Sequence, residues 1–596
     1  MVSRTLITTA DERTWPKDKK EPVLFLGEWC KRYSRKDIWE NMDYKVVPYH
    51  WDDRNKLYLD YQYLQKLYKK SIIDVSERLN RVHEVNHGAR YWTVLLGPWI
   101  GYFSHILYDR WFMLRKALDE YDSLKCYYIA REEGALISND MNQSTKLFNE
   151  DNWNELIYSQ LLKTYWSDQI ELIEIVPEVS LQSIESHNKK GIKEIIKEKI
   201  IGNLMNFFNK ISSKNTDYFF LSSHLPLKTE LKLQLKLGQF PKIWRSKSLQ
   251  ALNYNPKMRL LFSKDSQNYN NQEFDKVVDK FISLHLPKAY IDGYKDLVNE
   301  VQKLPWPSYP KVVFTSNAYS INDIFKCWAA EKVEKKIPLV IGQHGGHFGM
   351  NLYSFHEEHQ IEIADLWLSW GWSDIYREQI HPLGNIKLMG GKGVNYNPEG
   401  GALMVECGFP RYSNHLYSTP VASQFLNYLE DQKKFLKLLP MGLRNKVTLR
   451  LFPRNYGWDE KLRWEDNMPE IDVDLGVKNI CKLLNKSRLY ISTYNATTYL
   501  ESFTWNIPTI IFWNSKHWEL NEQAKPYFEL LKSVGIFHET PQSAAEHMIK
   551  IWNDVDSWWL SDLVQNAKNV FCVQYARNQE NSLNLLQNIL KETKSI

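Results

Sequence analysis

Short apolar runs alternate with amphipathic segments along most of the chain. In the first 392 residues, buried strands are predicted by the apolar runs at 22–27, 44–49, 124–129, 170–176, 218–225, 311–317, 338–342, 365–369 and 386–389. Helical periodicity separates several of them, at 57–86, 90–120, 275–302 and 323–335. Strands that alternate with helices are typical of a parallel sheet covered by helices. The pattern therefore predicts an α/β protein.

A glycine-rich stretch at 390–401 interrupts this alternation, and a second series of elements follows it. Its strands are predicted at 402–406, 446–452, 489–492 and 509–512, and its helices at 421–438, 477–484, 498–504 and 543–553. Because glycine-rich segments are typical of linkers, we expect two Rossmann-like lobes, at 1–392 and 393–575. A C-terminal helix within 576–596 is expected to pack back on the first lobe. An amphipathic helix at 191–208 and a basic, loop-rich stretch at 228–271 are expected as insertions in that lobe.

The composition of the chain makes some classes of function less favoured than others. The 596 residues include 76 basic and 71 acidic ones, a formal net charge of +5, which argues against a dedicated nucleic-acid-binding protein. So small an excess still permits weak attraction to an anionic membrane or substrate. The 23 tryptophans and 34 tyrosines suit sugar rings, nucleobases and membrane interfaces equally, although large cores also use aromatic side chains.

The sequence offers no signal for secretion or for a membrane span. Its six cysteines form no Cys-x-x-Cys pair, so neither a zinc site nor a disulfide framework is predicted and a reducing cytoplasm fits best. The N-terminus lacks the apolar core of a signal peptide. The apolar run at 94–103 is broken by Gly97-Pro98 and is too short to cross a bilayer. We therefore expect a cytoplasmic protein, at most peripheral on the inner face of the cytoplasmic membrane.

The stretch 488–501 joins a predicted strand end to a predicted helix start. The residues between them are small and polar: Ser492, Thr493, Asn495, Thr497 and Thr498. A helix start presents unpaired backbone N–H groups at the positive end of the helix dipole, where an anion binds well. The alternative is that Ser492 or Thr497 only caps the helix.

Two other predicted strand ends of the second lobe carry arginines. Gly408 and Arg411 follow the strand at 402–406, and Arg450 and Arg454 lie at the end of the strand at 446–452. Together with 492–498, these groups would hold a diphosphate or a nucleoside phosphate without a metal. The chain has no Gly-x-x-x-x-Gly-Lys-Ser/Thr loop and no Gly-x-Gly-x-x-Gly, which argues against an NTPase and a dehydrogenase.

The first lobe offers candidate acid–base groups at its own strand ends. Gln343-His344-Gly345-Gly346 follows the strand at 338–342. A histidine among glycines can face a ligand directly, although a tight turn could equally hold it. Further candidates are His224, the carboxylates Glu28 and Asp53, and Arg90, which a hydrophobic core would not require.

Two segments match metal-binding patterns, and both are better explained otherwise. His83-Glu-Val-Asn-His87 has the zincin spacing, but Gly88 ends the helix at once and no strong third ligand follows. Asp472-Val-Asp474 matches the Asp-x-Asp of metal-dependent sugar transfer, but it precedes a predicted helix, where the dipole favours aspartates. We therefore predict a helix start at 472–474, no metal and no cofactor other than a nucleotide-linked co-substrate.

Several of these residues resemble one family. Gln343-His-Gly-Gly, Trp370-Gly371, Leu451-Phe-Pro-Arg454 and 492–501, together with 24–30 and 90–111, resemble the bacterial transferases encoded in O-antigen and surface-polysaccharide gene clusters. The resemblance spans most of the chain and implies a GT-B-type glycosyltransferase. More remotely, the second lobe is similar to the Kdo and sialic acid transferases and to the teichoic-acid glycerophosphotransferases, which use CMP or CDP donors. Those enzymes usually carry His-Pro where this chain has Phe452-Pro453, which leaves the phosphate contact to Arg454 or Arg450.

The resemblance implies transfer of a sugar from a CMP-, CDP-, UDP- or GDP-linked donor to a growing glycan or lipid-linked glycan. The second lobe would bind the nucleotide and stabilise its leaving charge, and Glu501 would bind ribose hydroxyls or simply continue its helix. His344, Glu28 or Asp53 would deprotonate the acceptor hydroxyl. Residues expected on the acceptor side are Gln343, Gly345, Gly346, His224 and Arg90.

Two rival functions remain. A CDP-glycerol-type glycerophosphotransferase would share the donor lobe and would need a basic membrane-binding surface. A non-catalytic glycan-binding protein would explain the aromatic residues but would not need the arginine and hydroxyl groups at the strand ends.

Overall fold

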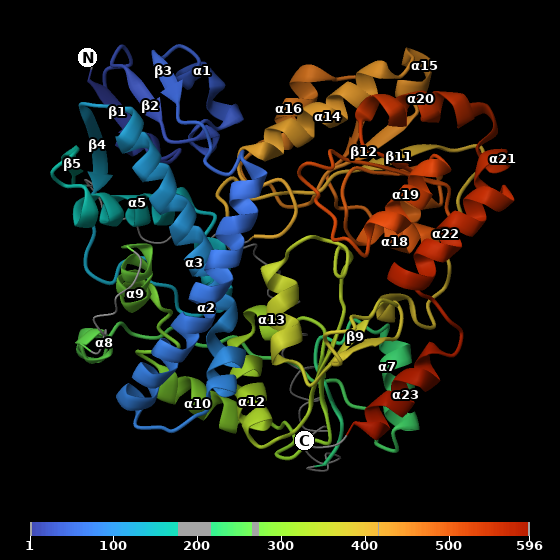
Figure 1. Ribbon diagram of the computed structural model, residues 1–596, viewed down its shortest axis with the longest axis horizontal. Coiled ribbons are helices and arrows are strands. Elements are labelled where there is room, and N and C mark those ends of the chain that lie inside the picture. The colour runs from blue at the N-terminus through green and yellow to red at the C-terminus, as the bar shows by residue number, and fades with distance from the viewer. Residues whose placement is uncertain (1–2, 177–215, 265–272, 415, 594–596) are drawn as a thin grey trace, which may run out of the picture.

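The computed structural model describes residues 3–176, 216–264, 273–414 and 416–593, and within them the strands form three parallel sheets (Figure 1). The helix predicted at 191–208 lies outside the described residues. We call the sheets the first, second and third sheet in chain order. The predicted α/β class is confirmed, and the part of the chain before residue 393 contains two of the three sheets.

The first sheet has the strand order β3-β2-β1-β4-β5. Its strands are β1 (Arg4–Ile7), β2 (Val23–Phe25), β3 (Tyr44–Val46), β4 (Leu124–Ile129) and β5 (Glu171–Ile175). The central strand β1 pairs with both β2 and β4, so the run at 22–27 forms the second strand of the chain and not the first. The order 3-2-1 followed by 4-5 is that of a doubly wound sheet.

The second sheet has its strands in consecutive order, β6 to β10. They are β6 (Phe219–Phe220), β7 (Val313–Thr315), β8 (Leu339–Gly342), β9 (Leu366–Ser369) and β10 (Ile380–Pro382). Alternate residues face opposite layers, because side chains alternate along a strand. Phe219 and Ile341 belong to the large central core, whereas Phe220 and Val340 belong to a separate core that includes Leu586 of the C-terminal helix α23 (Ser582–Glu592).

The third sheet has the order β13-β12-β11-β14-β15-β16, which is the 3-2-1-4-5-6 order of a dinucleotide-binding fold. Its strands are β11 (Gly401–Val405), β12 (Val447–Arg450), β13 (Asp472–Asp474), β14 (Ser487–Ser492), β15 (Thr509–Phe512) and β16 (Phe537–His538). The strand order reverses between β11 and β14, which pair directly. Ligands of such sheets bind beyond the carboxyl ends of the strands at this switch point.

Helices cover the sheets. Those in the part before residue 393 are α1 (Lys36–Trp39), α2 (Arg54–His83), α3 (Ala89–Glu120), α4 (Met141–Leu147), α5 (Asp151–Tyr165), α7 (Leu227–Lys236), α8 (Pro256–Lys264), α9 (Glu273–His285), α10 (Tyr294–Gln302), α11 (Ala318–Ile321), α12 (Asp323–Glu334) and α13 (Phe355–Ile363). Those that follow are α14 (Gln424–Leu438), α15 (Met441–Arg444), α16 (Glu460–Asn467), α17 (Ile480–Leu484), α18 (Thr497–Thr504), α19 (Lys525–Ser533), α20 (Pro541–Ile551), α21 (Val555–Trp559), α22 (Asp562–Tyr575) and α23. Figure 1 shows α23 beside α7, although the two are far apart in the chain.

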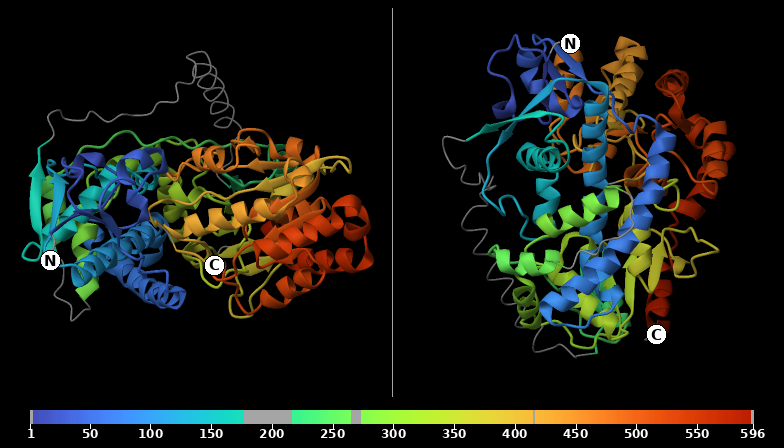
Figure 2. Two further views of the ribbon diagram at one scale, coloured as in Figure 1. Left: turned by 90° about the horizontal axis from the view of Figure 1, so that it is seen from above. Right: turned by 60° about the vertical axis from the view of Figure 1, so that its left-hand side comes forward.

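The long helices α2 and α3 pack against each other, and Figure 2 shows α2 running down the molecule from the first sheet. Helix α3 continues through the Gly97-Pro98 pair. Glycines at 97 and 101 let α13 approach α3 closely, because a Cβ at Gly101 would lie 1.8 Å from a ring carbon of Phe355. None of the helices in the described residues has the length and the apolar character that crossing a lipid bilayer requires.

Two local predictions were wrong. Asp472–Asp474 is not a helix start but the edge strand β13, and Asp472 accepts a hydrogen bond from Thr448 of β12 (2.9 Å). The run at 386–389 is a short 3-10 helix, Ile386–Leu388, instead of a strand. The stretch from 228 contains α7 (Leu227–Lys236) and α8 (Pro256–Lys264), and the residues between them, 237–255, are loop, in keeping with the prediction.

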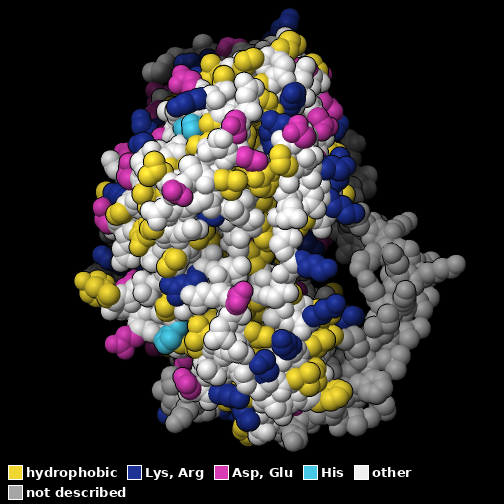
Figure 3. Space-filling model, turned by 90° about the vertical axis from the view of Figure 1, so that its right-hand side faces the viewer, with side chains coloured by type: hydrophobic (Ala, Val, Ile, Leu, Met, Phe, Trp, Pro, Cys, Tyr) yellow, Lys and Arg dark blue, Asp and Glu magenta, His cyan; other side chains and the backbone are white. Residues whose placement is uncertain are grey.

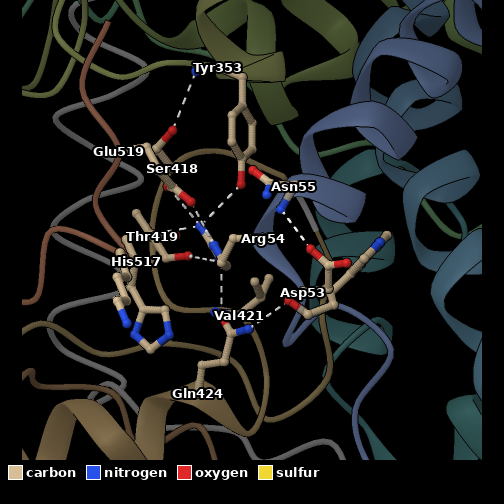
Figure 4. A network of polar contacts seen from close by, with 12 residues as sticks. Asp53, Arg54, Asn55, Tyr353, Ser418, Thr419, Val421, Gln424, His517 and Glu519 are labelled. Atoms are coloured by element: carbon tan, nitrogen blue, oxygen red, sulfur yellow. Dashed lines mark hydrogen bonds and ion pairs between the residues drawn. The ribbon is translucent and has the colours of Figure 1, made fainter.

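Arg54, the first residue of α2, contacts three segments that are distant from it in the sequence (Figure 4). Its guanidinium makes a two-point ion pair with Glu519 of the loop after β15, with Nε–Oε1 2.7 Å and Nη2–Oε2 2.9 Å. It also donates to Gln424 (2.8 Å) at the start of α14 and to the Tyr353 hydroxyl (3.1 Å), which precedes α13. One side chain therefore connects α2 with segments next to the second and third sheets.

Candidate functional site

The loop after β8 and the start of α18 meet directly. The backbone N–H of Gly346 donates to Oγ1 of Thr497 over 3.0 Å. A Cβ at Gly346 would lie 2.3 Å from the carbonyl oxygen of Ala496, so only glycine permits this approach. The second sheet thus places its histidine loop against the helix start that follows the third sheet's central strand β14.

Among the described residues, no side chain caps α18. Its N-cap residue is Ala496, and Thr497 is already the first helical residue. Ser492 donates instead to the carbonyl of Tyr494 (3.1 Å), and Thr498 interacts with the Tyr494 hydroxyl (2.9 Å). The alternative in which Ser492 or Thr497 caps the helix therefore does not occur. The first-turn N–H groups, at the positive end of the helix dipole, have no side-chain acceptor in the part of the chain that the structure describes.

Two of the predicted polar residues support the loop from inside. Thr493 is buried, donates to the carbonyl of Val405 (2.9 Å) and interacts with the Tyr428 hydroxyl (2.6 Å). Asn495 is also buried, where it accepts from the Tyr499 hydroxyl (2.8 Å). Both fix the shape of the turn between β14 and α18.

His344 lies in a group of imidazoles. Its ring is 5.8 Å from that of His224 and 5.5 Å from that of His356, measured between centroids. Burial, reinforced by the neighbouring histidines, holds the pKa of His344 well below its usual value. Its Nδ1 atom is buried without a hydrogen-bond partner among the described residues. His344 is therefore a neutral imidazole at physiological pH.

Gln343 shapes this loop. Its side-chain NH₂ donates to the carbonyl of Gly345 (2.7 Å), and its Oε1 accepts from the backbone of Trp370 (2.9 Å) and from Nε1 of Trp372 (3.1 Å). Gln343 and the Trp370-Gly371 turn, two of the segments that carry the family resemblance, are thus in contact with each other.

Lys387 is a site residue that the sequence did not indicate. It lies in the 3-10 helix after β10, and its Nζ forms an ion pair with Oε1 of Glu501 on α18 (2.6 Å). Burial, followed by the charge of Lys387, lowers the pKa of His224. A single lysine inside the apolar run at 386–389 was the available signal. The charge of Lys387 therefore acts on both His224 and Glu501.

The predicted arginines differ in what they contact. Arg450 is paired with Asp474 (2.6 Å) and with the carbonyl of Gly476 (2.8 Å). Arg411 is buried and is engaged by the carbonyl of Trp29 and by the carboxylate of Asp151 (2.7 Å). Both guanidinium groups therefore have structural partners already.

Arg454 is the exposed arginine of the three. Its guanidinium lies 4.7 Å from the centre of the Tyr456 ring. The rings of Phe452 and Tyr456 stack with their centroids 5.9 Å apart, and Phe452 is 42% exposed. Gly408 lies against this pair, because a Cβ there would be 2.7 Å from the Phe452 ring. The loop after β12 thus presents an accessible aromatic and a cation together.

Three further predicted residues lie among other elements. Glu28 forms an ion pair with Lys31 (3.0 Å) in a short helix after β2. Asp53 caps α2 by accepting from the backbone of Asn55 and Lys56. Arg90 pairs with Asp365 (2.8 Å), which precedes β9 and so marks the amino-terminal edge of the second sheet, opposite to His344. The structure does not bring these three beside the histidine loop.

The zincin-like histidines do not share a helix face. Helix α2 ends at His83, whose Nε2 contacts the carbonyl of Tyr290 (2.8 Å), whereas His87 lies beyond the helix and pairs with Glu334 (2.7 Å). Within the described residues, no group of three or more potential ligands could hold a metal ion.

The chain was compared with protein families, curated proteins and solved structures. The model of the LIC12162 family of transferases matches residues 4–590. No curated protein matches the chain. Among solved structures, the wall teichoic acid polymerase TagF is 11% identical, with 67% of this chain and 96% of that chain covered and a TM-score of 0.30. MurG from Acinetobacter baumannii is also 11% identical, with 51% and 78% covered and a TM-score of 0.27.

Proposed function

The chain belongs to the LIC12162 family of transferases, and from this premise we propose that it moves a sugar from a nucleotide-linked donor to a growing surface glycan, such as an O-antigen. The observation that carries the proposal is the contact between Gly346 and Thr497. It joins a loop that bears a neutral histidine to a helix start suited to an anion. A base and a phosphate site in direct contact are what group transfer from a nucleotide requires.

The donor would bind along the third sheet. The uncapped first turn of α18 would hold the phosphate, and the exposed Arg454 would supply the positive charge that a diphosphate needs. Phe452 and Tyr456 would receive the nucleobase on an aromatic surface. Arg450 and Arg411, which have their own carboxylates, would support the loops and would not touch the phosphate.

His344 would take the proton from the acceptor hydroxyl. A base must be unprotonated, and burial among other histidines keeps His344 neutral. Gly345, Gly346 and His224 would line the acceptor side, and Glu501 would exchange its contact with Lys387 for the ribose hydroxyls when the nucleotide enters. The acceptor would be a glycan or a lipid-linked glycan at the inner face of the cytoplasmic membrane.

A nucleotide panel tests the donor. Thermal shift with CMP-, CDP-, UDP- and GDP-linked sugars and with CDP-glycerol should give one class that raises Tm, and calorimetry should then give its Kd. Arg454→Ala should weaken that binding at least tenfold, because a charged contact to phosphate is lost. Arg115→Ala, a change at an exposed arginine on α3, is the matched control and should leave Kd unchanged.

The same panel separates the rival functions. Stabilisation by CDP-glycerol alone would identify a glycerophosphotransferase, and no stabilisation by any nucleotide would favour a glycan-binding protein. With the donor known, His344→Gln should lower kcat by about 100- to 10,000-fold while donor Kd stays the same. A variant that keeps full kcat would remove His344 from the mechanism.

A further inference from the structure

The outer face of α7 is apolar where a helix of a globular protein is normally polar. Its inner face packs on the second sheet through Leu233 and, just after the helix, Leu237. On its outer face, Leu227 is 56% exposed and Leu235 is 61% exposed. Phe240, in the loop that follows, is 67% exposed. Large apolar side chains gathered on a surface mark a binding face.

Basic side chains accompany this apolar face. Lys228, Lys232 and Lys236 repeat every four residues, so they form a row beside the exposed leucines. Between residues 227 and 250 the chain has six basic residues and one acidic residue. The acidic one, Glu230, interacts with the Ser223 hydroxyl and is turned away from the lysine row. Lys228 and Lys232 are the exposed members of this row, because Lys236 donates to Oδ1 of Asn584 in α23 (2.9 Å).

Leucine and phenylalanine beside lysine form the pattern of a helix that lies in a membrane interface. The apolar side chains enter the boundary between headgroups and acyl chains, and each lysine gains about 1 kcal/mol near an anionic leaflet. Figure 3 faces the side of the molecule on which α7 and α23 lie, and its lower half shows lysine and arginine side chains next to hydrophobic ones.

We propose that α7 and the segment that follows it to Phe240 dock the protein on an anionic lipid bilayer. We call this surface, defined by Leu227, Lys228, Lys232, Leu235 and Phe240, the α7 surface. Helix α7 begins three residues after His224, in the loop that leaves β6. Docking would therefore hold the acceptor side of the second sheet next to the bilayer. This last step rests on the proposed function, whereas lipid binding itself does not.

Vesicle binding by the full chain tests the proposal. The protein is sedimented with phosphatidylcholine vesicles that contain or lack phosphatidylglycerol, with no nucleotide present. Binding is expected only with phosphatidylglycerol and should decline as salt is added, because salt screens surface charge. Lys228→Gln/Lys232→Gln should weaken binding by about 30-fold, as expected from about 1 kcal/mol per lysine.

The chain offers a control with the same spacing. Lys478, Lys482 and Lys486 are exposed and also repeat every four residues, but they lie beside the third sheet. Lys478→Gln/Lys482→Gln/Lys486→Gln should bind vesicles like the wild type. Equal losses in both variants, or no binding to anionic vesicles, would overturn the proposal.

A second variant addresses the apolar part. Leu227→Gln/Leu235→Gln/Phe240→Gln changes exposed side chains, so its Tm should stay close to that of the wild type. It should lose about tenfold in vesicle affinity. If the wild type instead forms a dimer in sedimentation velocity and this variant does not, a second copy occupies the α7 surface and the membrane proposal fails. Transfer to a soluble acceptor should be unchanged in both α7 variants, which separates this proposal from the proposed function.

Discussion

Lys387 and Glu501 form an ion pair that joins the second sheet's side of the molecule to α18, with Nζ 2.6 Å from Oε1. The lysine side chain is 30% exposed and the glutamate side chain is 10% exposed. A carboxylate so little exposed is destabilising when its partner is removed. The pair therefore belongs to the contact between the two sheets, and it lies on the helix that we propose for phosphate binding.

A double-mutant cycle measures this pair. Lys387→Met should lower the free energy of unfolding, because it leaves the Glu501 carboxylate without its cation. Adding Glu501→Gln should restore part of the loss, with a coupling energy of about 0.5 to 3 kcal/mol. Thermal unfolding of the wild type, both single variants and the double variant gives the value. Strictly additive effects would show that the pair contributes nothing.

Gly346 and Gly345 offer a matched test of the close approach at the site. Gly346→Ala should force the histidine loop away from α18, because its Cβ would meet the Ala496 carbonyl at 2.3 Å. Overpacking of this kind costs about 1 to 3 kcal/mol, and the donor affinity should fall as well. Calorimetry with the donor found in the panel, together with Tm, measures both effects.

The neighbouring substitution is the control. At Gly345 the nearest atom to a new Cβ is Oγ1 of Thr497 at 3.2 Å, so Gly345→Ala should have a much smaller effect on both quantities. Similar losses in the two variants would mean that the loop tolerates no side chain at all, and that the Gly346 contact is not special.

The sequence predicted four of the six strands of the third sheet, and β13 and β16 were missed. The strands expected at 402–406, 489–492 and 509–512 correspond to β11, β14 and β15. Strands of parallel sheets are buried on both faces, so they read as continuous apolar runs. β1 was missed because it has only four residues, one of which is Arg4, and because Thr5 is polar although fully buried.

The sequence predicted the candidate site only where the residues of the site are neighbours in the chain. The loop 343–346 and the stretch 492–501 could be found because each is a strand end with unusual residues. The partners of Arg411 could not, since Trp29 and Asp151 come from the region of the first sheet. The role of Lys387 could not be predicted either, because its partner Glu501 lies 114 residues away in the sequence.

Glu357 predicts an unusual pH dependence of stability. Burial raises the pKa of its carboxyl to about 8 from the usual 4.5, although the carboxylate accepts a hydrogen bond from the backbone of Gly349 (2.9 Å). Between these pH values the unfolded chain loses the proton and the folded protein keeps it. Folding therefore loses up to about 1.4 kcal/mol per pH unit as the pH rises through this window.

Glu357→Gln removes this penalty while its side-chain oxygen can still accept from Gly349. The Tm of the variant minus that of the wild type should increase from about pH 4.5 to pH 8 and then level off. Urea unfolding at several pH values measures the same trend in free energy. A difference that stays constant over this range would contradict a raised pKa at Glu357.

Arg54→Lys tests whether the two-point ion pair with Glu519 holds the parts of the molecule together. Lysine keeps the charge but cannot reproduce the planar fork that reaches Glu519, Gln424 and Tyr353 at once. Each lost hydrogen bond to a charged group costs about 1.5 to 3 kcal/mol, so the variant should be destabilised by roughly 2 to 4 kcal/mol. Thermal unfolding gives the size of the effect, and limited proteolysis should cut the variant faster near Tyr353.

Arg115→Lys, at an exposed arginine on α3, is the control and should change stability by less than about 0.5 kcal/mol. If Arg54→Lys also stays within that limit, the segments are held by their backbone contacts, such as the hydrogen bond from Leu352 to Glu519 (2.9 Å), and the guanidinium is dispensable.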